Sequence, residues 1–258
     1  MPEGDTIHRS AASLRRWLVG REITGARTQV ASLALDRVIG QTVDDVEARG
    51  KHLLMRLTPS GRVLHSHMRM TGSWHVYPAG QPWRRPARQA RLVLECGDHV
   101  AVCFNAPVIE LLKDGGELLH PSLSKLGPDI LDDQLDVHGI RTRAKARDPE
   151  VSLGELLLDQ RVVSGVGNIW RCEALYAERL NPWTPRAAIT DDQWDALVST
   201  AARLMRTSAR GTMADRPVAQ VHRRAGRPCP RCGTRIEARQ QGDLARTAYW
   251  CPTCQPPA

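Results

Sequence analysis

The sequence of 258 residues has no uninterrupted apolar run of about 18 residues, the length that a membrane-spanning helix needs. It also lacks a positively charged leader followed by a short hydrophobic segment, which is the pattern of a secretory signal. No internal repeat and no low-complexity tract is present. From these absences we expect neither a membrane protein nor a secreted one. They favour a cytoplasmic protein whose seven cysteines stay reduced.

Lysine is missing from the stretch 203–246, although this stretch holds eleven arginines and only three acidic residues. The excess, 11 − 3 = 8, equals the formal net charge of the whole chain, +8. A basic block confined to one end is typical of a protein that binds a polyanion, and the planar guanidinium suits phosphate oxygens. The alternative is a solvated face that only keeps the protein soluble.

The first half of the chain has the pattern of a β-protein. Short β-rich segments alternate with turn signals, and a β-sandwich or barrel is the natural way to pack them. The predicted strands span residues 21–29, 41–49, 51–58, 62–68, 91–95 and 100–104. Residues 77–88, which are rich in proline and charge, are predicted to form an exposed loop.

The second half has helical periodicity. Apolar residues recur at helical spacing around 153–157, 169–175 and 190–208, and the last of these segments opens with Thr190-Asp191-Asp192. We therefore predict an α+β protein of two domains, since 258 residues suffice for a core in each. The predicted parts are a β-sandwich domain with a flanking helix (1–120), a linker (121–136), a helical domain (137–225) and a metal-binding module (226–258).

The N-terminal residues carry a candidate nucleophile. If Met1 is removed, Pro2 presents a secondary amine, and an α-amino group with a pKa of about 7.7–8.0 is partly unprotonated near neutrality. Glu3 beside it can relay the protons that Schiff-base chemistry requires. Because proline followed by glutamate is also common where helices begin, a purely structural role is the alternative. Asp5 is predicted to be the N-cap of a helix over residues 6–19.

Four cysteines near the C-terminus form the most specific local motif. Cys229-Pro230-Arg231-Cys232 and Cys251-Pro252-Thr253-Cys254 are two Cys-x-x-Cys pairs with 18 residues between them. Four thiolates on two tight turns suit tetrahedral Zn²⁺, and a fully occupied coordination shell predicts one structural ion. A redox dithiol or a pair of disulfides is the alternative. Cys96, Cys103 and Cys172 are outside this motif and are predicted to be buried.

Four further segments are candidates for contacts with phosphate or bases, and two of them lie in the second half of the chain. Residues 242–250 resemble a β-hairpin whose tip would project Arg246. In Gly165-Val166-Gly167-Asn168, the glycines let backbone amides converge at the start of a helix, where an anion is favoured. The side chain of Asn168 adds a hydrogen-bond donor there. The alternative is a simple turn between two helices that requires glycine.

The remaining candidates lie in the first half. Lys51 follows Gly50 at the start of a strand, where a lone lysine is usually solvent-facing. Residues 67–72, His-Met-Arg-Met-Thr-Gly, end another strand, and a methionine in that turn is either an apolar wedge for a base stack or a core residue.

Taken together, these motifs resemble the bacterial formamidopyrimidine-DNA glycosylase and endonuclease VIII family, and the resemblance covers nearly the whole chain. They occur in the family's order, from Pro2-Glu3-Gly4-Asp5 through residues 50–51, 67–72 and 158–169 to the four cysteines and Gln255. The resemblance implies an N-terminal β-sandwich, a helix-two-turn-helix domain and a zinc finger. It also implies a monomeric, nucleoid-associated bifunctional glycosylase and abasic-site lyase that acts on damaged double-stranded DNA in base-excision repair.

The resemblance assigns a role to each candidate residue. It makes Pro2 the Schiff-base nucleophile at C1′ and Glu3 the general acid and base, and Met70 the wedge that fills the gap left by an extruded base. The predicted phosphate contacts are Lys51, which we group with the catalytic residues, together with His67, Asn168 and Arg246.

One departure indicates the branch of the family. The formamidopyrimidine branch inserts an Arg-Phe pair from a β-hairpin, and residues 99–113 contain no such pair. With this absence and with Pro-Glu-Gly-Asp at its start, the chain looks more like the endonuclease VIII branch, which predicts a preference for oxidised pyrimidines. The alternatives are a purine-directed glycosylase, an enzyme restricted to abasic sites, and a non-catalytic zinc protein that binds damaged DNA.

Overall fold

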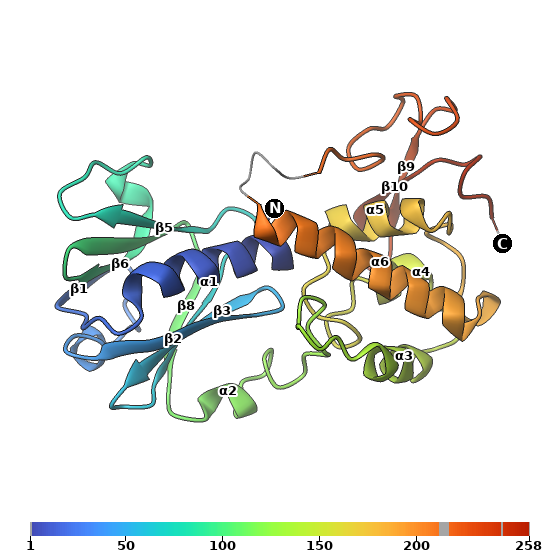
Figure 1. The fold of residues 1–258 in the computed structure, drawn as a ribbon. Helices are drawn as coiled ribbons and strands as arrows, with labels where there is room; N and C mark the ends of the chain where they lie inside the picture. Colours follow the sequence, from blue (N-terminus) through green and yellow to red (C-terminus); the bar gives the residue numbers. More distant parts are fainter. Residues whose placement is uncertain (1, 212–216, 244, 258) are drawn as a thin grey trace. The chain divides into compact units, whose positions relative to one another are not determined.

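The computed structural model describes residues 2–211, 217–243 and 245–257 of the chain (Figure 1). The chain divides into two compact units, Met1–Ser124 and Lys125–Ala258, and each is described by itself. The division lies within the stretch predicted to be a linker, and the finer boundaries at residues 120, 136 and 225 stay predictions. Among the described residues, no helix is both long and apolar enough to cross a membrane.

The first unit is built on two four-stranded antiparallel sheets, which confirms the predicted β-sandwich. One sheet has the order β2-β3-β4-β8 and the other β1-β6-β7-β5. The strands are β1 (Gly25–Thr28), β2 (Thr42–Arg49), β3 (His52–Thr58), β4 (Val63–His67), β5 (Ser73–Pro78), β6 (Ala90–Cys96), β7 (His99–Phe104) and β8 (Val108–Leu112). Short helical turns lie at η1 (Leu35–Arg37), η2 (Ala87–Gln89) and α2 (Gly116–Leu119).

Strands β5 and β8 were not predicted from the sequence. Residues 77 and 78 were expected in a loop, but they end β5, which pairs with β7. Strand β8 pairs with β4 at the edge of the other sheet. Each is short, and the pairing partner supplies the hydrogen bonds that make the segment a strand.

Helix α1 (Gly4–Leu18) begins earlier than predicted. The backbone carbonyl of Glu3 accepts hydrogen bonds from the amides of Thr6 and Ile7, so Glu3 is the N-cap. The prediction of Asp5 as the N-cap was wrong; Asp5 lies buried in the first turn, where the helix dipole favours a carboxylate. The apolar face of α1 packs into the core of the sandwich through Ile7, Ala11, Leu14 and Leu18.

The second unit is mainly helical, as its periodicity predicted. Helix α6 opens with a capping box formed by Thr190 and Gln193, in agreement with the predicted start. The helices are α3 (Val137–Lys145), α4 (Leu153–Leu156), α5 (Asn168–Ala177), η3 (Arg186–Ala188) and α6 (Asp191–Arg210). They share one core that includes Trp170 and Trp194, both almost fully buried.

The C-terminal hairpin pairs β9 (Glu237–Gln241) with β10 (Arg246–Trp250). A hairpin was predicted over residues 242–250, but its first strand lies before residue 242. Arg246 pairs with Gln241, so it is the first residue of the returning strand rather than the tip of the turn. A small cluster of buried side chains beneath the hairpin, including Cys172, Tyr176, Val221 and Ile236, joins it to α5.

Candidate functional site

Pro2 and Glu3 lie where α1 begins. Pro2 is half-buried and Glu3 is fully buried, with a relative exposure of 0 %. Glu3 has an extended backbone, and its side chain does not cap the helix. A carboxyl group that is removed from solvent beside the second residue is therefore held in place without serving as a cap.

Lys51 and His67 lie at the same end of the first sheet. Gly50 and Lys51 form the two-residue turn between β2 and β3, and Gly50 has the positive φ of 59° that such a turn requires. The turn is closed by the pair Arg49 and His52. His52 is in turn the cross-strand partner of His67, the last residue of β4. Sheet pairing therefore brings two predicted phosphate contacts together.

The ring of His67 is set up as a neutral hydrogen-bond donor. Its Nδ1 accepts a hydrogen bond from the backbone amide of Arg69 at 3.0 Å, which places the proton on Nε2. Burial lowers the pKa of His67 to about 4, and the charges of Arg69 and Lys51 and the neighbouring His65 act in the same direction. The ring therefore offers an N–H group while Lys51 supplies the charge.

Met70 is an exposed residue of a turn whose backbone is held by its neighbours. Its relative exposure is 54 %, which excludes the core role that was the alternative. A Cβ atom at Gly72 would lie 2.7 Å from the carbonyl oxygen of Met68, so the turn requires glycine there. Thr71 adds a hydrogen bond to the carbonyl of Asn105 at 3.3 Å. The thioether is thus presented to solvent from a fixed backbone.

Asn168 and Arg246 are connected through a buried arginine that the sequence did not single out. Nδ2 of Asn168 donates to the carbonyl of Thr247 at 2.9 Å, so this side chain also ties α5 to the hairpin. Nη2 of Arg171, which is fully buried, donates to Oδ1 of Asn168 at 2.6 Å and to the carbonyl of Arg246 at 3.2 Å. The buried guanidinium of Arg171 therefore holds both Asn168 and the backbone of Arg246 in position.

Gln241 extends this network into the rest of the unit. Its Oε1 accepts from Nη1 of Arg171 at 3.0 Å, and its Nε2 donates to Ser152 and to the carbonyl of Pro182, both at 2.8 Å. Gln241 is 5 % exposed although it lies in a hairpin. The turn end of the hairpin is therefore anchored by side-chain hydrogen bonds in a dry environment.

The glycine loop before α5 is held by Gln160. Oε1 of Gln160 accepts from the amide of Gly165 at 3.1 Å, and its Nε2 donates to the carbonyl of Val166 at 3.0 Å. Gly165 has a φ of 97°, which side-chain-bearing residues rarely adopt. Asn168 is the first residue of α5, so the loop presents the positive end of that helix, as predicted for an anion site.

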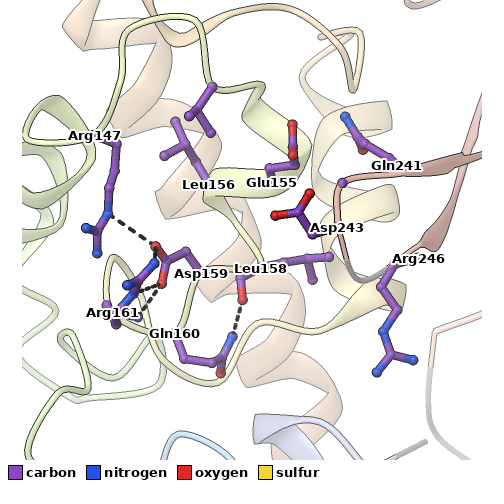
Figure 2. A pocket seen from close by; sticks show the side chains of 12 residues that line it. Arg147, Glu155, Leu156, Leu158, Asp159, Gln160, Arg161, Gln241, Asp243 and Arg246 are labelled. Carbon is purple, nitrogen blue, oxygen red and sulfur yellow. Dashed lines mark hydrogen bonds and ion pairs between the residues drawn. The ribbon is translucent and has the colours of Figure 1, made fainter.

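A cavity of about 530 Å³ lies between residues of the range 147–161 and the hairpin (Figure 2). Asp159 accepts two hydrogen bonds from the side chain of Arg161, each at 2.9 Å, and lies 3.2 Å from Arg147. Arg246 lies at the hairpin side of the cavity, with its guanidinium directed away from the hairpin in Figure 2. The three arginines of the lining, Arg147, Arg161 and Arg246, are accompanied by three carboxylates, Glu155, Asp159 and Asp243, so the charges of the cavity are balanced.

The four predicted zinc ligands converge. The sulfur atoms of Cys229, Cys232, Cys251 and Cys254 all lie within 4.8 Å of one another. Two of the separations are 3.9 Å (Cys229 to Cys254) and 3.4 Å (Cys232 to Cys251), against about 3.8 Å expected between ligands that each lie about 2.3 Å from tetrahedral zinc. The residues therefore fit Zn²⁺, as the motif predicted. Cys96, Cys103 and Cys172 are buried, also as predicted.

Glu173 is another functional candidate that the sequence did not single out. Its carboxylate accepts hydrogen bonds from the backbone amides of Gln220, Val221 and His222, at 2.8, 3.1 and 2.9 Å. This carboxylate fixes the segment that leads into the cysteine module. A charged residue within an apolar helical segment was the only available indication.

The comparisons with known proteins agree with this geometry. The N-terminal domain of formamidopyrimidine-DNA glycosylase matches residues 1–107, and its H2TH domain matches residues 126–216. The zinc finger found in FPG and IleRS matches residues 226–257. The chain therefore belongs to the formamidopyrimidine-DNA glycosylase family, and the resemblance predicted from the motifs is confirmed.

Curated relatives place the chain close to the endonuclease 8 branch. A probable endonuclease 8 2 from Streptomyces coelicolor is 39 % identical, with 99 % of this chain and 94 % of that protein covered. The DNA-(apurinic or apyrimidinic site) lyase Nei2 of Mycolicibacterium smegmatis is 35 % identical over 99 % of both chains.

Solved structures share the fold. Lactococcus lactis formamidopyrimidine-DNA glycosylase, bound non-covalently to DNA that contains an abasic site, has a TM-score of 0.85 at 20 % identity. The match covers 99 % of this chain and 100 % of that one. At this identity the likeness establishes the fold, and it confirms the predicted β-sandwich, helix-two-turn-helix and zinc-finger architecture.

Proposed function

We propose that this chain is a bifunctional DNA glycosylase and abasic-site lyase of base-excision repair that works through a Schiff base on Pro2. The observation that carries the proposal is the position of Glu3, which is fully buried beside Pro2 and does not cap α1. A carboxyl group kept from water next to an N-terminal secondary amine suits proton transfer during covalent catalysis. The reaction requires that Met1 be removed.

The proposed chemistry proceeds in balanced steps. The Pro2 nitrogen attacks C1′ of the damaged nucleotide, the bond from C1′ to the base breaks, and the departing base takes up a proton. The Pro2 nitrogen loses its proton, and the C1′–O4′ bond then breaks, so that the sugar ring opens, O4′ takes up a proton and an iminium forms between Pro2 and C1′. This iminium acidifies the 2′ proton, whose loss expels the 3′ phosphate; a second elimination expels the 5′ phosphate. Glu3 serves as the general acid and base in these transfers. The base is first extruded, because C1′ is inaccessible in stacked duplex.

The other candidate residues hold the DNA in this proposal. Lys51 and the Nε2–H group of His67 bind phosphate from one end of the first sheet, and Met70 enters the base stack from its exposed turn. Asn168 and Arg246 bind phosphate from the second unit, where Arg171 holds them together. The partner is thus double-stranded DNA with a damaged base or an abasic site, bound by a monomer.

One structural Zn²⁺ on the four cysteines keeps the hairpin folded in this proposal. The residues that would hold it are Cys229, Cys232, Cys251 and Cys254. The absence of an Arg-Phe pair in residues 99–113 supports oxidised pyrimidines as the preferred lesions.

Borohydride trapping tests the proposed function. Duplexes that carry an abasic site, 5-hydroxyuracil or 8-oxoguanine opposite cytosine are incubated with the purified protein, whose intact mass establishes that Met1 is absent. We expect a covalent adduct that maps to Pro2 on the first two substrates, with 8-oxoguanine processed more slowly. An adduct on the abasic duplex alone indicates a lyase without glycosylase activity.

The matched variant is Pro2→Gly. The enzyme should lose most of its turnover while keeping much of its affinity for DNA, whereas a pure binding protein loses nothing. No adduct on any substrate with Met1 absent would rule the proposal out in favour of a DNA-binding role. Faster excision of 8-oxoguanine would overturn the lesion class alone.

A further inference from the structure

Histidines gather on one face of the first unit. The chain has nine histidines, and four of them form what we call the histidine cluster: His52, His65, His67 and His120, together with Glu110. The family assignment uses only His67 from this group. The other members bear no role in the proposed chemistry.

The cluster follows from the pleat of the sheet β2-β3-β4-β8. Leu53, Met55 and Leu64 point into the core between the sheets, so the alternating residues of β3 and β4 point to the opposite face. The register places His65 directly opposite Glu110 and His52 opposite His67. The pairing of three strands therefore concentrates imidazoles and a carboxylate on this face.

Helix α2 completes the cluster. Glu117 of α2 is 6 % exposed and forms an ion pair of 2.9 Å with Arg56, a residue of β3 on the same face. This ion pair holds α2 over the sheet, and His120 directly follows the helix. His120 thereby comes to lie with its ring centre 5.1 Å from that of His65.

Two histidine nitrogens converge on one carboxylate oxygen. Nδ1 of His65 lies 3.2 Å and Nε2 of His120 lies 3.3 Å from the same atom, Oε1 of Glu110. The three ligand atoms all lie within 4.8 Å of one another. Ligands that lie about 2.0–2.1 Å from a tetrahedral Zn²⁺ are about 3.3–3.4 Å apart, so both distances match an edge of that coordination shell.

We propose that His65, Glu110 and His120 form a second metal site, separate from the four cysteines, for a divalent ion of the Zn²⁺ and Co²⁺ type. Two imidazoles with one carboxylate suit such ions, with water in the remaining position. The side chain of Glu110 is 40 % exposed, which gives the ion and its water a route from solvent. The side chain of His65 is 1 % exposed, so it forms the buried side of the site.

His52 supports the site from behind. Its Nδ1 lies 2.8 Å from Nε2 of His65. With the metal on Nδ1 of His65, the proton of that ring lies on Nε2 and is donated to His52, which fixes the ring orientation as supporting hydrogen bonds do in known metal sites.

Two hydrogen bonds to His120 limit the affinity for the metal. Nδ1 of His120 accepts hydrogen bonds from the amides of Ser122 and Leu123, both at 3.3 Å. Metal on Nε2 moves the ring proton to Nδ1, so these two long bonds must loosen. We therefore expect weaker binding than at the four cysteines.

Cobalt titration of the full chain with zinc already on the cysteines tests the proposal. We expect one further equivalent of Co²⁺ with visible absorption but without the strong near-ultraviolet charge transfer of thiolate ligands. X-ray absorption at the cobalt edge should show nitrogen and oxygen neighbours and no sulfur.

Glu110→Gln and His120→Asn are the test variants, since both replacements retain hydrogen-bonding side chains. Each should weaken binding of the further equivalent by about tenfold or more. His138→Ala, which removes an exposed histidine of α3, is the control and should leave it unchanged. Circular dichroism and thermal melting establish that each variant is folded.

The proposal fails if no further equivalent binds or if sulfur surrounds the added cobalt. It also fails if folded Glu110→Gln and His120→Asn bind like the unsubstituted chain. If one variant does not fold, the proposal is judged from the cobalt binding of the other variant and from the ligands that X-ray absorption finds around cobalt in the unsubstituted chain.

Discussion

The guanidinium of Arg171 donates a hydrogen bond to Oδ1 of Asn168 across one turn of α5, at 2.6 Å. The same guanidinium reaches the carbonyl of Arg246, so one buried side chain sets the positions of two proposed phosphate contacts. Arg171 itself is a positioning residue, because it is fully buried.

We predict that Arg171→Met lowers the free energy of unfolding of the second unit by about 2–4 kcal/mol, since buried acceptors on Asn168, Gln241 and the hairpin lose their donor. Hydrogen–deuterium exchange should rise in β9 and β10, and affinity for abasic DNA should fall. Arg143→Met, an exposed arginine of α3, is the matched control. Unchanged exchange in the hairpin would contradict the positioning role.

Arg246→Ala should weaken binding to all DNA sequences alike, because phosphate carries no sequence information. The slope of log K against log salt concentration should become shallower by about 0.9, the value for one phosphate. Fluorescence anisotropy over a salt series measures it. The control is Arg37→Ala, which replaces an exposed arginine of the first unit and should keep the original slope. An equal slope for both variants would show that Arg246 does not contact phosphate.

Met70→Ala should separate stability from function. A side chain with 54 % exposure contributes little to folding, so the melting temperature should change little. Excision from a paired duplex should slow, because the gap beside the extruded base stays empty, whereas excision from a single strand should be affected less. Equal losses on both substrates would indicate that Met70 is not a wedge.

Cys251→Ser should unfold the segment 226–257 and weaken DNA binding while the N-terminal sandwich stays folded. Limited proteolysis followed by mass spectrometry locates the change. The variant is preferable to a chelator, which would also strip the proposed site at Glu110. Cleavage within the strands of the first unit would contradict this prediction, because it would show that the first unit loses its fold when the zinc ligands are disrupted.

Asp159→Asn should change the acid stability of the second unit. Burial alone raises the pKa of Asp159, but hydrogen bonds from Arg161 and the charge of Arg147 outweigh it and hold the pKa below its usual range. This contribution is present above about pH 4 and is lost as the pH falls through the folded-state pKa.

The variant should therefore be less stable at pH 7, by about 1 kcal/mol or less because Arg161 is 59 % exposed and solvent screens the pair. The difference should shrink below about pH 4. Urea unfolding at several pH values measures it, and a difference that grows on acidification would contradict the assignment.

Local motifs were predictable because their chemistry lies within a few residues of sequence. The two Cys-x-x-Cys turns, the glycine loop before Asn168 and the capping box at Thr190 are of this kind. Arg171 was not predictable, since arginine is rarely buried and a sequence pattern assigns it to the surface.

Long-range pairing was the other obstacle. His65 and Glu110 are neighbours only because β8 pairs with β4, and β8 was itself missed. Asp5 illustrates a smaller error of a local kind, since a favourable first-turn residue was taken for the cap. Where a contact depends on register between distant strands, composition and spacing do not determine it.

Gln241 also bears on how this chain can exchange parts with its relatives. Its amide is bonded to Ser152, to the Pro182 carbonyl and to Arg171, all outside the cysteine module. Recombination that imports a foreign hairpin alone would leave these buried groups mismatched. We therefore expect the cysteine module to be exchangeable only together with Ser152, Arg171 and Pro182, so that a functional chimera needs its crossover before Ser152 rather than at the first cysteine.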